Sequence, residues 1–157
     1  HREIVSSQYK SGSTTLCHGD VNRSNLLFPN NVSDKPMLID WQLAGQKVLP
    51  FDLSYFVVKA LTVEQRREHE DALLKEYYEL LPDTIRASYS FDRLALDYRA
   101  CVTRSMLSAV TKFGPIFESD PNRFKAADNL SARVIEAMRD LKPVDAIEEL
   151  EKRGCLK

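Results

Sequence analysis

Two short, mostly apolar runs in the first third of the chain each lead directly to an aspartate, and this feature most constrains the fold. Residues 16–25 read LCHGDVNRSN, and residues 37–45 read MLIDWQLAG. A carboxylate that is buried without a partner destabilises a protein strongly, because it loses its hydration. The fold must therefore bring a cation or several hydrogen-bond donors to Asp20 and Asp40.

Composition and charge narrow the class of protein. The chain has 157 residues, of which 43% are hydrophobic and 29% charged, as expected for one globular domain. Twenty-two basic residues against twenty-three acidic ones give a net charge of −1, and no long basic run is present, so we expect no nucleic-acid partner. No signal peptide or long apolar run is present, which argues against a membrane partner.

The three cysteines, Cys17, Cys101 and Cys155, are far apart and show no CxxC or other zinc-binding spacing. An odd number of scattered cysteines is typical of reduced thiols. We therefore expect a cytoplasmic protein without structural zinc, and we expect Cys17 to behave as a small buried apolar residue.

The apolar runs NLLF and PMLIDW are separated by PNNVSDK, which is rich in turn-forming residues and predicts a β-hairpin. From Phe51 onward the apolar spacing becomes helical. Five helices are expected, over PFDLSYFVVKAL, TVEQRREHEDALLKEYYELL, FDRLALDYRACVTRSMLSAVTKF, Asp120-Pro121 to about Leu141, and Pro143 to near Gly154. The predicted fold class is α+β, mainly α, with a small β-hairpin docked on a helical bundle.

Two further expectations concern burial. Trp41 is predicted to be a core aromatic. The charged residues of the second predicted helix are predicted to form its solvated face: Glu64, Arg66, Arg67, Glu68, Glu70 and Asp71.

The predicted hairpin gathers three polar residues at one end. Asp20 and Asn25 lie five positions apart in the loop that leads into the first strand, and Asp40 ends the second strand. Carboxylate and amide oxygens select a hard cation such as Mg²⁺, which commonly binds through one or two protein groups and substrate phosphates. Phosphoryl transfer uses this set of groups: one Asp meets the attacking hydroxyl, while an Asn and a second Asp hold the metal.

The segments HGDVNRSNLLF and LIDWQLAGQKVLPFDLSYF resemble the catalytic half of the aminoglycoside phosphotransferase and choline kinase superfamily. CHGD and EQRREHEDALLKEYYELL resemble its ecdysteroid-kinase-like branch. The resemblance is dense over residues 15–59. It implies a protein-kinase-like carboxy-terminal lobe, with a catalytic loop and metal hairpin over 15–59 and a helical substrate lobe over 60–157.

The resemblance also assigns roles. It implies that Asp20 is the catalytic aspartate, that Asn25 and Asp40 bind Mg²⁺, and that Asp52 holds the catalytic loop in place. His18 is expected to be a packed, hydrogen-bonded support rather than a ligand.

Leu27 and Ile39 are predicted to form an apolar floor for the adenine of ATP. Strand alternation would place Leu27 on the same side as Asn25, and the resemblance implies a base lying over the hairpin.

Departures from protein kinases indicate the class of substrate. This chain has Asn22 where protein kinases have a catalytic-loop lysine, and Trp41-Gln42 in place of Phe-Gly. The expected partners are therefore a nucleoside triphosphate and a small hydroxyl-bearing acceptor. A glycine-rich phosphate loop is missing from the sequence, so the amino-terminal nucleotide lobe is expected to lie outside residues 1–157. The carboxy-terminal lobe formed by residues 1–157 is expected to be inactive alone.

Other interpretations stay open at this point. Asp20, Asn25 and Asp40 are also common turn and cap residues, so the chain could be a non-catalytic kinase-like or helical interaction module. A metal-dependent hydrolase would use similar oxygen ligands, but it would normally need more clustered acids or histidines.

Overall fold

The structure is a computed structural model that describes the backbone of residues 14–31, 35–113 and 121–156, and the side chains of these residues outside 110–128. The first part contains short strands and 3₁₀ turns: β1 Thr14–Cys17, η1 Arg23–Asn25, β2 Leu26–Leu27, β3 Met37–Leu38, η2 Trp41–Leu43 and β4 Gly45–Val48. The second part is helical: α2 Phe51–Ala60, α3 Val63–Glu79, α4 Asp83–Arg86, α5 Phe91–Phe113, α6 Pro121–Leu141 and α7 Pro143–Lys152. The described fold is thus mainly helical with a small antiparallel β component, as predicted.

The strands form two antiparallel pairs. In the predicted hairpin, β2 pairs with β3, with Leu26 opposite Leu38 and Leu27 opposite Met37. The second pair, β1 with β4, was not predicted, because its strands lie far apart in sequence. Its register runs from Thr14 opposite Val48 to Cys17 opposite Gly45.

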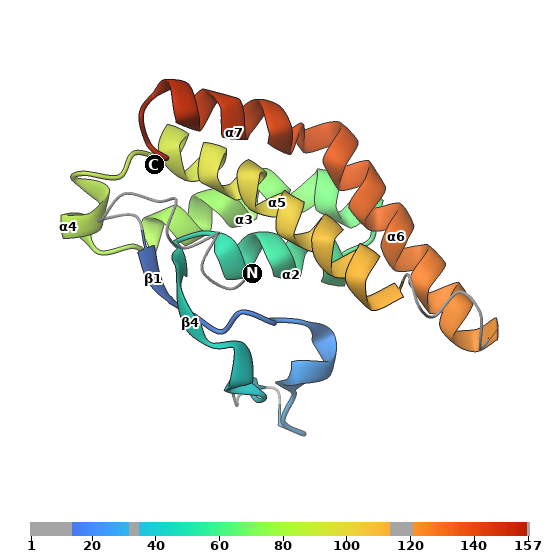
Figure 1. Cartoon of the computed structure of the whole chain (residues 1–157). Coiled ribbons are helices and arrows are strands. Elements are labelled where there is room, and N and C mark those ends of the chain that lie inside the picture. The colour runs from blue at the N-terminus through green and yellow to red at the C-terminus, as the bar shows by residue number, and fades with distance from the viewer. Residues whose placement is uncertain (1–13, 32–34, 114–120, 157) are drawn as a thin grey trace.

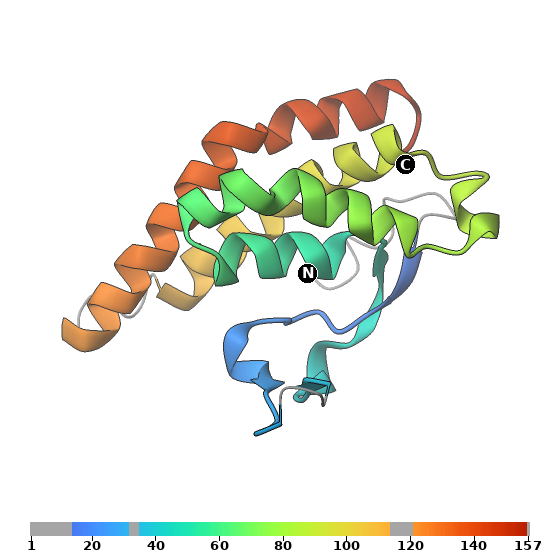
Figure 2. The same cartoon turned by 180° about the vertical axis from the view of Figure 1, so that it is seen from behind.

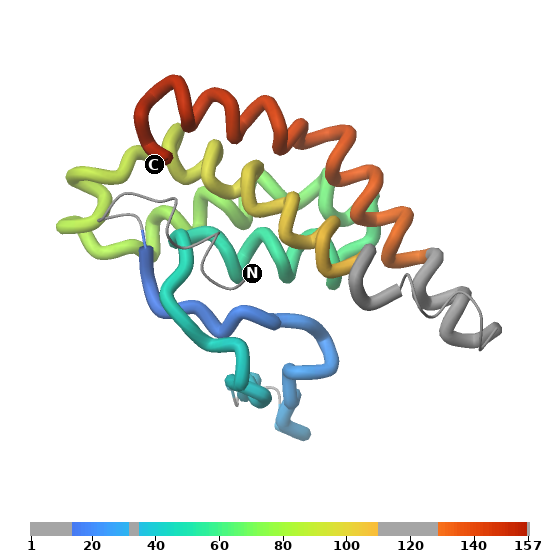
Figure 3. Tube along the Cα trace, in the orientation of Figure 1, coloured from blue at the N-terminus to red at the C-terminus, as the bar shows by residue number. Residues whose placement is uncertain are grey.

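Helix α5 lies at the centre of the bundle and packs against α2, α6 and α7. Figure 1 and, from behind, Figure 2 show the strand segments on one side of this bundle, next to α2. The Cα trace in Figure 3 shows how β4 leads directly into α2. This arrangement places the loop after β1 beside the amino-terminal half of α2.

Local sequence signals account for several helix boundaries. Thr62 and Gln65 form a complete capping box at the start of α3, with each side chain accepting from the other residue's backbone N–H. Pro143 occupies the first turn of α7, where its missing N–H has no helical partner in any case. The Ser90 hydroxyl accepts from the Arg93 N–H at the start of α5. The short helix α4 was not predicted.

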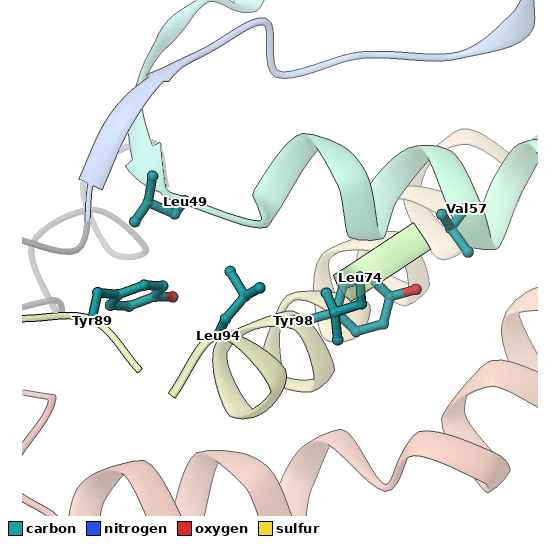
Figure 4. Close-up of a cluster of buried hydrophobic side chains, with 6 residues drawn as sticks. All are labelled: Leu49, Val57, Leu74, Tyr89, Leu94 and Tyr98. Carbon is teal, nitrogen blue, oxygen red and sulfur yellow. The ribbon is translucent and has the colours of Figure 1, made fainter. Parts of the chain in front are cut away.

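The main core cluster joins the end of β4 to α2, α3 and α5. Figure 4 shows its buried side chains, Leu49, Val57, Leu74, Tyr89, Leu94 and Tyr98. A second cluster of Cys17, Val48, Phe51 and Cys101 packs the β1–β4 pair against the bundle. Cys17 is buried, as predicted, and this packing holds the loop that follows β1 close to α2.

Two burial predictions were wrong. The Trp41 side chain is 50% exposed. Its indole N–H donates to the Leu38 carbonyl oxygen at 3.0 Å and its ring packs edge-on against His18, and these contacts do not place it in a core cluster. Arg66 is buried at 2% exposure, because its guanidinium meets Glu70 on its own helix and Asp140 on α6. The charged face of α3 is therefore partly an interface with another helix.

Among the helices in the described part of the chain, none is both long enough and apolar enough to cross a bilayer.

Candidate functional site

The loop after β1 is attached to the first turn of α2 by one carboxylate. Asp52 Oδ2 accepts from the His18 N–H at 2.6 Å, and Asp52 Oδ1 accepts from the Gly19 N–H at 2.9 Å. A carboxylate with two backbone donors is held firmly, and a helix amino terminus favours its negative charge. Asp52 therefore sets the path of the chain directly before Asp20.

Glycine is the residue type that suits position 19. Its φ is +88°, and a Cβ there would lie 2.3 Å from the carbonyl oxygen of Leu43. The close approach brings the loop after β1 against η2. The HGD sequence thus contains a glycine for a steric reason.

His18 connects the two sides of the site. Its ring is buried, Nδ1 accepts from the Asp20 N–H at 3.3 Å, and Nε2 lies 2.8 Å from the Ile39 carbonyl oxygen. This network assigns the ring proton to Nε2, which donates to Ile39. His18 therefore links the backbone at Asp20 to the backbone just before Asp40.

Asn25 makes a second link between the same two segments. Its side-chain nitrogen donates to the backbone carbonyl oxygen of Asp20 at 2.9 Å, and its backbone carbonyl oxygen accepts from the Ile39 N–H at 3.0 Å. The residue is buried at the end of η1. With the amide nitrogen engaged, the amide oxygen is the atom of this side chain that can ligate a cation.

Asp40 follows this link directly. It lies two residues beyond β3 rather than at the strand end, has φ +64°, and precedes η2. Aspartate adopts this left-handed conformation more readily than most residues, because its short polar side chain bonds locally. Gln42 Nε2 lies 3.4 Å from Asp40 Oδ2, and the side chain is exposed. That Asn25 and Asp40 share one cation stays a prediction.

The Asp20 side chain contacts residues that the sequence analysis missed. The Tyr55 hydroxyl donates to Asp20 Oδ1 at 2.7 Å, and Lys59 Nζ donates to the Tyr55 oxygen at 2.6 Å and to Ser108 Oγ at 2.8 Å. Burial raises the pKa of Tyr55 to about 12, so its hydroxyl keeps its proton at neutral pH. A signal existed in the sequence: Asp52, Tyr55 and Lys59 have the i, i+3, i+7 spacing of one helix face.

The two predicted nucleotide-floor residues lie near this site but are not buried. Leu27 is 50% exposed and Ile39 36% exposed. Strand alternation does not place Leu27 on the same side as Asn25, because Asn25 belongs to the 3₁₀ turn η1 rather than to β2. A role for Leu27 and Ile39 beneath a base stays a prediction.

The candidate cation ligands of the site are oxygen atoms. Within the part of the chain that the structure describes, no three His, Cys, Asp or Glu side chains are close enough together to hold a metal ion. The Asn25 amide oxygen and the Asp40 carboxylate are oxygen donors of the kind Mg²⁺ prefers, and phosphates and water commonly complete its coordination.

Comparison with known proteins assigns the chain to a family. The profile of the DUF1679 family, described as "Uncharacterized oxidoreductase dhs-27", matches residues 7–150, and the chain belongs to this family. The chain is also similar to "Uncharacterized kinase-like protein D1044.1" of Caenorhabditis elegans, with 31% identity over 85 residues. That alignment covers 54% of the chain but only 23% of the relative. No solved structure matches the chain.

These comparisons support a kinase-like superfamily at a coarse level, through the name of the relative, and they do not select a branch. The family description instead names an oxidoreductase.

Proposed function

We propose that the protein is an ATP-dependent phosphotransferase that acts on a hydroxyl group of a small molecule, with this chain as its kinase-like carboxy-terminal lobe. The observation that carries the proposal is the double link between Asp20 and the segment before Asp40. Asn25 bonds to both segments, and the His18 ring bonds to both as well. Residues that the resemblance assigns to catalysis and metal binding are thereby connected in the fold.

In this proposal each residue has one task. Asp20 orients the acceptor hydroxyl and accepts its proton, while Asp52 and His18 hold the loop that carries Asp20. Asn25 and Asp40 would hold Mg²⁺, which neutralises charge on the nucleotide phosphates when bound.

Leu27 and Ile39 provide exposed apolar surface for the adenine. The free cysteines favour a reducing, cytoplasmic compartment. Of the branches of the superfamily, we favour the ecdysteroid-kinase-like one, on the HGD loop and the charged helix α3.

An oxidoreductase function fits the described fold less well. Nicotinamide dinucleotides commonly bind at the carboxyl ends of parallel strands, beside a glycine-rich turn. In the described residues both strand pairs are antiparallel, and the five glycines of the sequence are scattered. The polar groups that do converge, Asp20, Asn25 and the backbone before Asp40, suit phosphate chemistry better than hydride transfer.

The test is a phosphotransfer assay with the full-length protein, MgATP and a panel of small hydroxyl and amine acceptors, steroid alcohols included. Asp20→Asn and Asp40→Asn should each lower turnover by about 10³-fold, because phosphoryl transfer depends almost entirely on positioning and electrostatics. Asp71→Asn, on the exposed face of α3, is the matched control and should leave turnover unchanged.

Undiminished transfer by both site variants would contradict the proposed site. No transfer to any acceptor, together with no binding of MgATP by calorimetry, would favour the non-catalytic module instead.

A further inference from the structure

A chain of hydrogen bonds runs from α2 and α5 to the carboxylate of Asp20. Lys59 Nζ contacts the Tyr55 oxygen and Ser108 Oγ, and the Tyr55 hydroxyl contacts Asp20 Oδ1. Lys59 Nζ also lies 3.8 Å from the centroid of the Tyr55 ring. Tyr55 and Ser108 are buried, while Asp20 and Lys59 are half-buried, so these contacts are partly shielded from water.

The donors and acceptors of this chain give it a direction. A lysine ammonium can only donate, so the Tyr55 oxygen accepts from Lys59. A tyrosine hydroxyl has a single proton, and its 2.7 Å contact with Asp20 Oδ1 is much shorter than its 3.3 Å contact with Ser108 Oγ. The Tyr55 proton therefore points at Asp20. Donation from a cation polarises the hydroxyl and strengthens the bond that it donates.

Apart from Asp20, the groups of this chain lie on two helices that pack against each other. Tyr55 and Lys59 lie one turn apart on α2, the helix whose Asp52 holds the backbone of His18 and Gly19. Ser108 comes from α5, which packs against α2. One helix thus fixes both the backbone before Asp20 and the side chain of Asp20.

We propose that Tyr55 and Lys59 are positioning residues for Asp20. Lys59 directs the Tyr55 hydroxyl towards Asp20 Oδ1, and this contact sets the orientation of the carboxylate towards the acceptor. The proposal rests on the proposed function, and it assigns Lys59 an effect on Asp20 through Tyr55 rather than a contact with a phosphate.

The test is a double-mutant cycle in the full-length protein with Tyr55→Phe, Lys59→Met and the two combined. Tyr55→Phe keeps the ring and removes only the hydroxyl. Each single variant should lower kcat about tenfold or more, with KM for ATP changed less than about twofold, because orientation is lost and nucleotide contacts are kept. The combined variant should be no slower than Tyr55→Phe. Tyr78→Phe and Lys75→Met, on α3, are the matched controls.

The same double-mutant cycle is also applied to the unfolding equilibrium constant in urea, a measurement that does not depend on activity. The two changes should be coupled by about fivefold in the unfolding equilibrium constant, and circular dichroism checks that each variant is folded. If Lys59→Met slows kcat equally in both backgrounds, or raises KM for ATP, Lys59 acts directly on a ligand and the proposal is overturned. If the unaltered protein transfers no phosphate, the proposed function fails. A coupling below about twofold in the unfolding equilibrium constant would separately overturn the proposed link between Lys59 and Tyr55.

Discussion

At the scale of single residues, the site depends on positions where one residue type is required by geometry. Gly19 has a left-handed backbone and lies against the Leu43 carbonyl, while the Asp52 carboxylate accepts from the backbone N–H groups of His18 and Gly19. Asp40 also has a positive φ, in a loop whose Ile39 backbone is bonded to Asn25 and His18. Such positions tolerate little substitution, even where the side chain takes no part in chemistry.

Gly19→Ala should destabilise the protein by about 1–3 kcal/mol or more, because an L side chain is strained at φ +88° and its Cβ would clash with backbone. Urea unfolding measures the change. The matched control is Gly45→Ala, whose Cβ would meet only the Lys47 ammonium, at 3.6 Å. Equal stability of the two variants would mean that the loop after β1 can move away from Leu43.

Leu27→Asp tests the predicted adenine floor. A charge in place of an apolar contact should raise KM for ATP about tenfold or more, because burying a leucine side chain contributes about 1.5–3 kcal/mol. Steady-state kinetics of the full-length protein at varied ATP give the value. Leu80→Asp, at a side chain that is 78% exposed beyond α3, is the control. An unchanged KM for Leu27→Asp would remove Leu27 from the nucleotide site.

At the scale of secondary-structure elements, α3 and α6 are joined by a charged cluster. The Arg66 guanidinium contacts Asp140, and Arg67 Nε lies 2.8 Å from Asp140 Oδ2. Arg66 also pairs with Glu70, which accepts from the Tyr98 hydroxyl on α5 at 2.7 Å. Three helices thus meet at one buried guanidinium, and removal of a partner leaves charge uncompensated.

Asp140→Asn should lower the free energy of unfolding at pH 7 by about 1 kcal/mol, through the loss of charge on a partly exposed pair. Hydrogen bonding to Arg67 lowers the pKa of Asp140 below its ordinary 3.8. The contribution is therefore fully present above pH 3.8 and is lost as pH falls through the folded-state pKa. Urea unfolding at a series of pH values should show the difference between the two proteins shrinking in that acidic range. A difference that is constant down to pH 2.5 would assign it to packing rather than to charge.

At the scale of the whole molecule, stability depends on the core that connects the end of β4 to the helices. Leu94 on α5 is fully buried in the core cluster that also contains Leu49, directly after β4, and Leu74 of α3. Because α5 also carries Ser108, a loosened core would disturb the contacts of Ser108 at the candidate site.

Leu94→Ala should cost about 2–5 kcal/mol, since it removes buried methyl groups and leaves a cavity. The midpoint of urea unfolding reports this loss. Leu80→Ala, at an exposed position, should change the free energy of unfolding by less than about 0.5 kcal/mol. A Leu94→Ala protein as stable as the Leu80→Ala protein would show that α5 is not packed as described.

The sequence by itself determined features that depend on neighbouring residues. The β2–β3 hairpin, the capping box of Thr62 and Gln65, and the start of α7 at Pro143 all follow from turn and cap chemistry that acts over a few residues. The sequence also identified Asp20, Asn25 and Asp40 as one candidate group.

Only the tertiary structure decided the features that depend on residues far apart in the chain. It pairs β1 with β4, buries Arg66 against Asp140, leaves Trp41 half exposed, and joins Tyr55 to Asp20. Helix periodicity says which residues share a face, but it does not say what that face meets. The partner of a buried charge or hydroxyl is set by the packing of distant elements, and for that reason the contacts around Asp20 could not be predicted from the sequence.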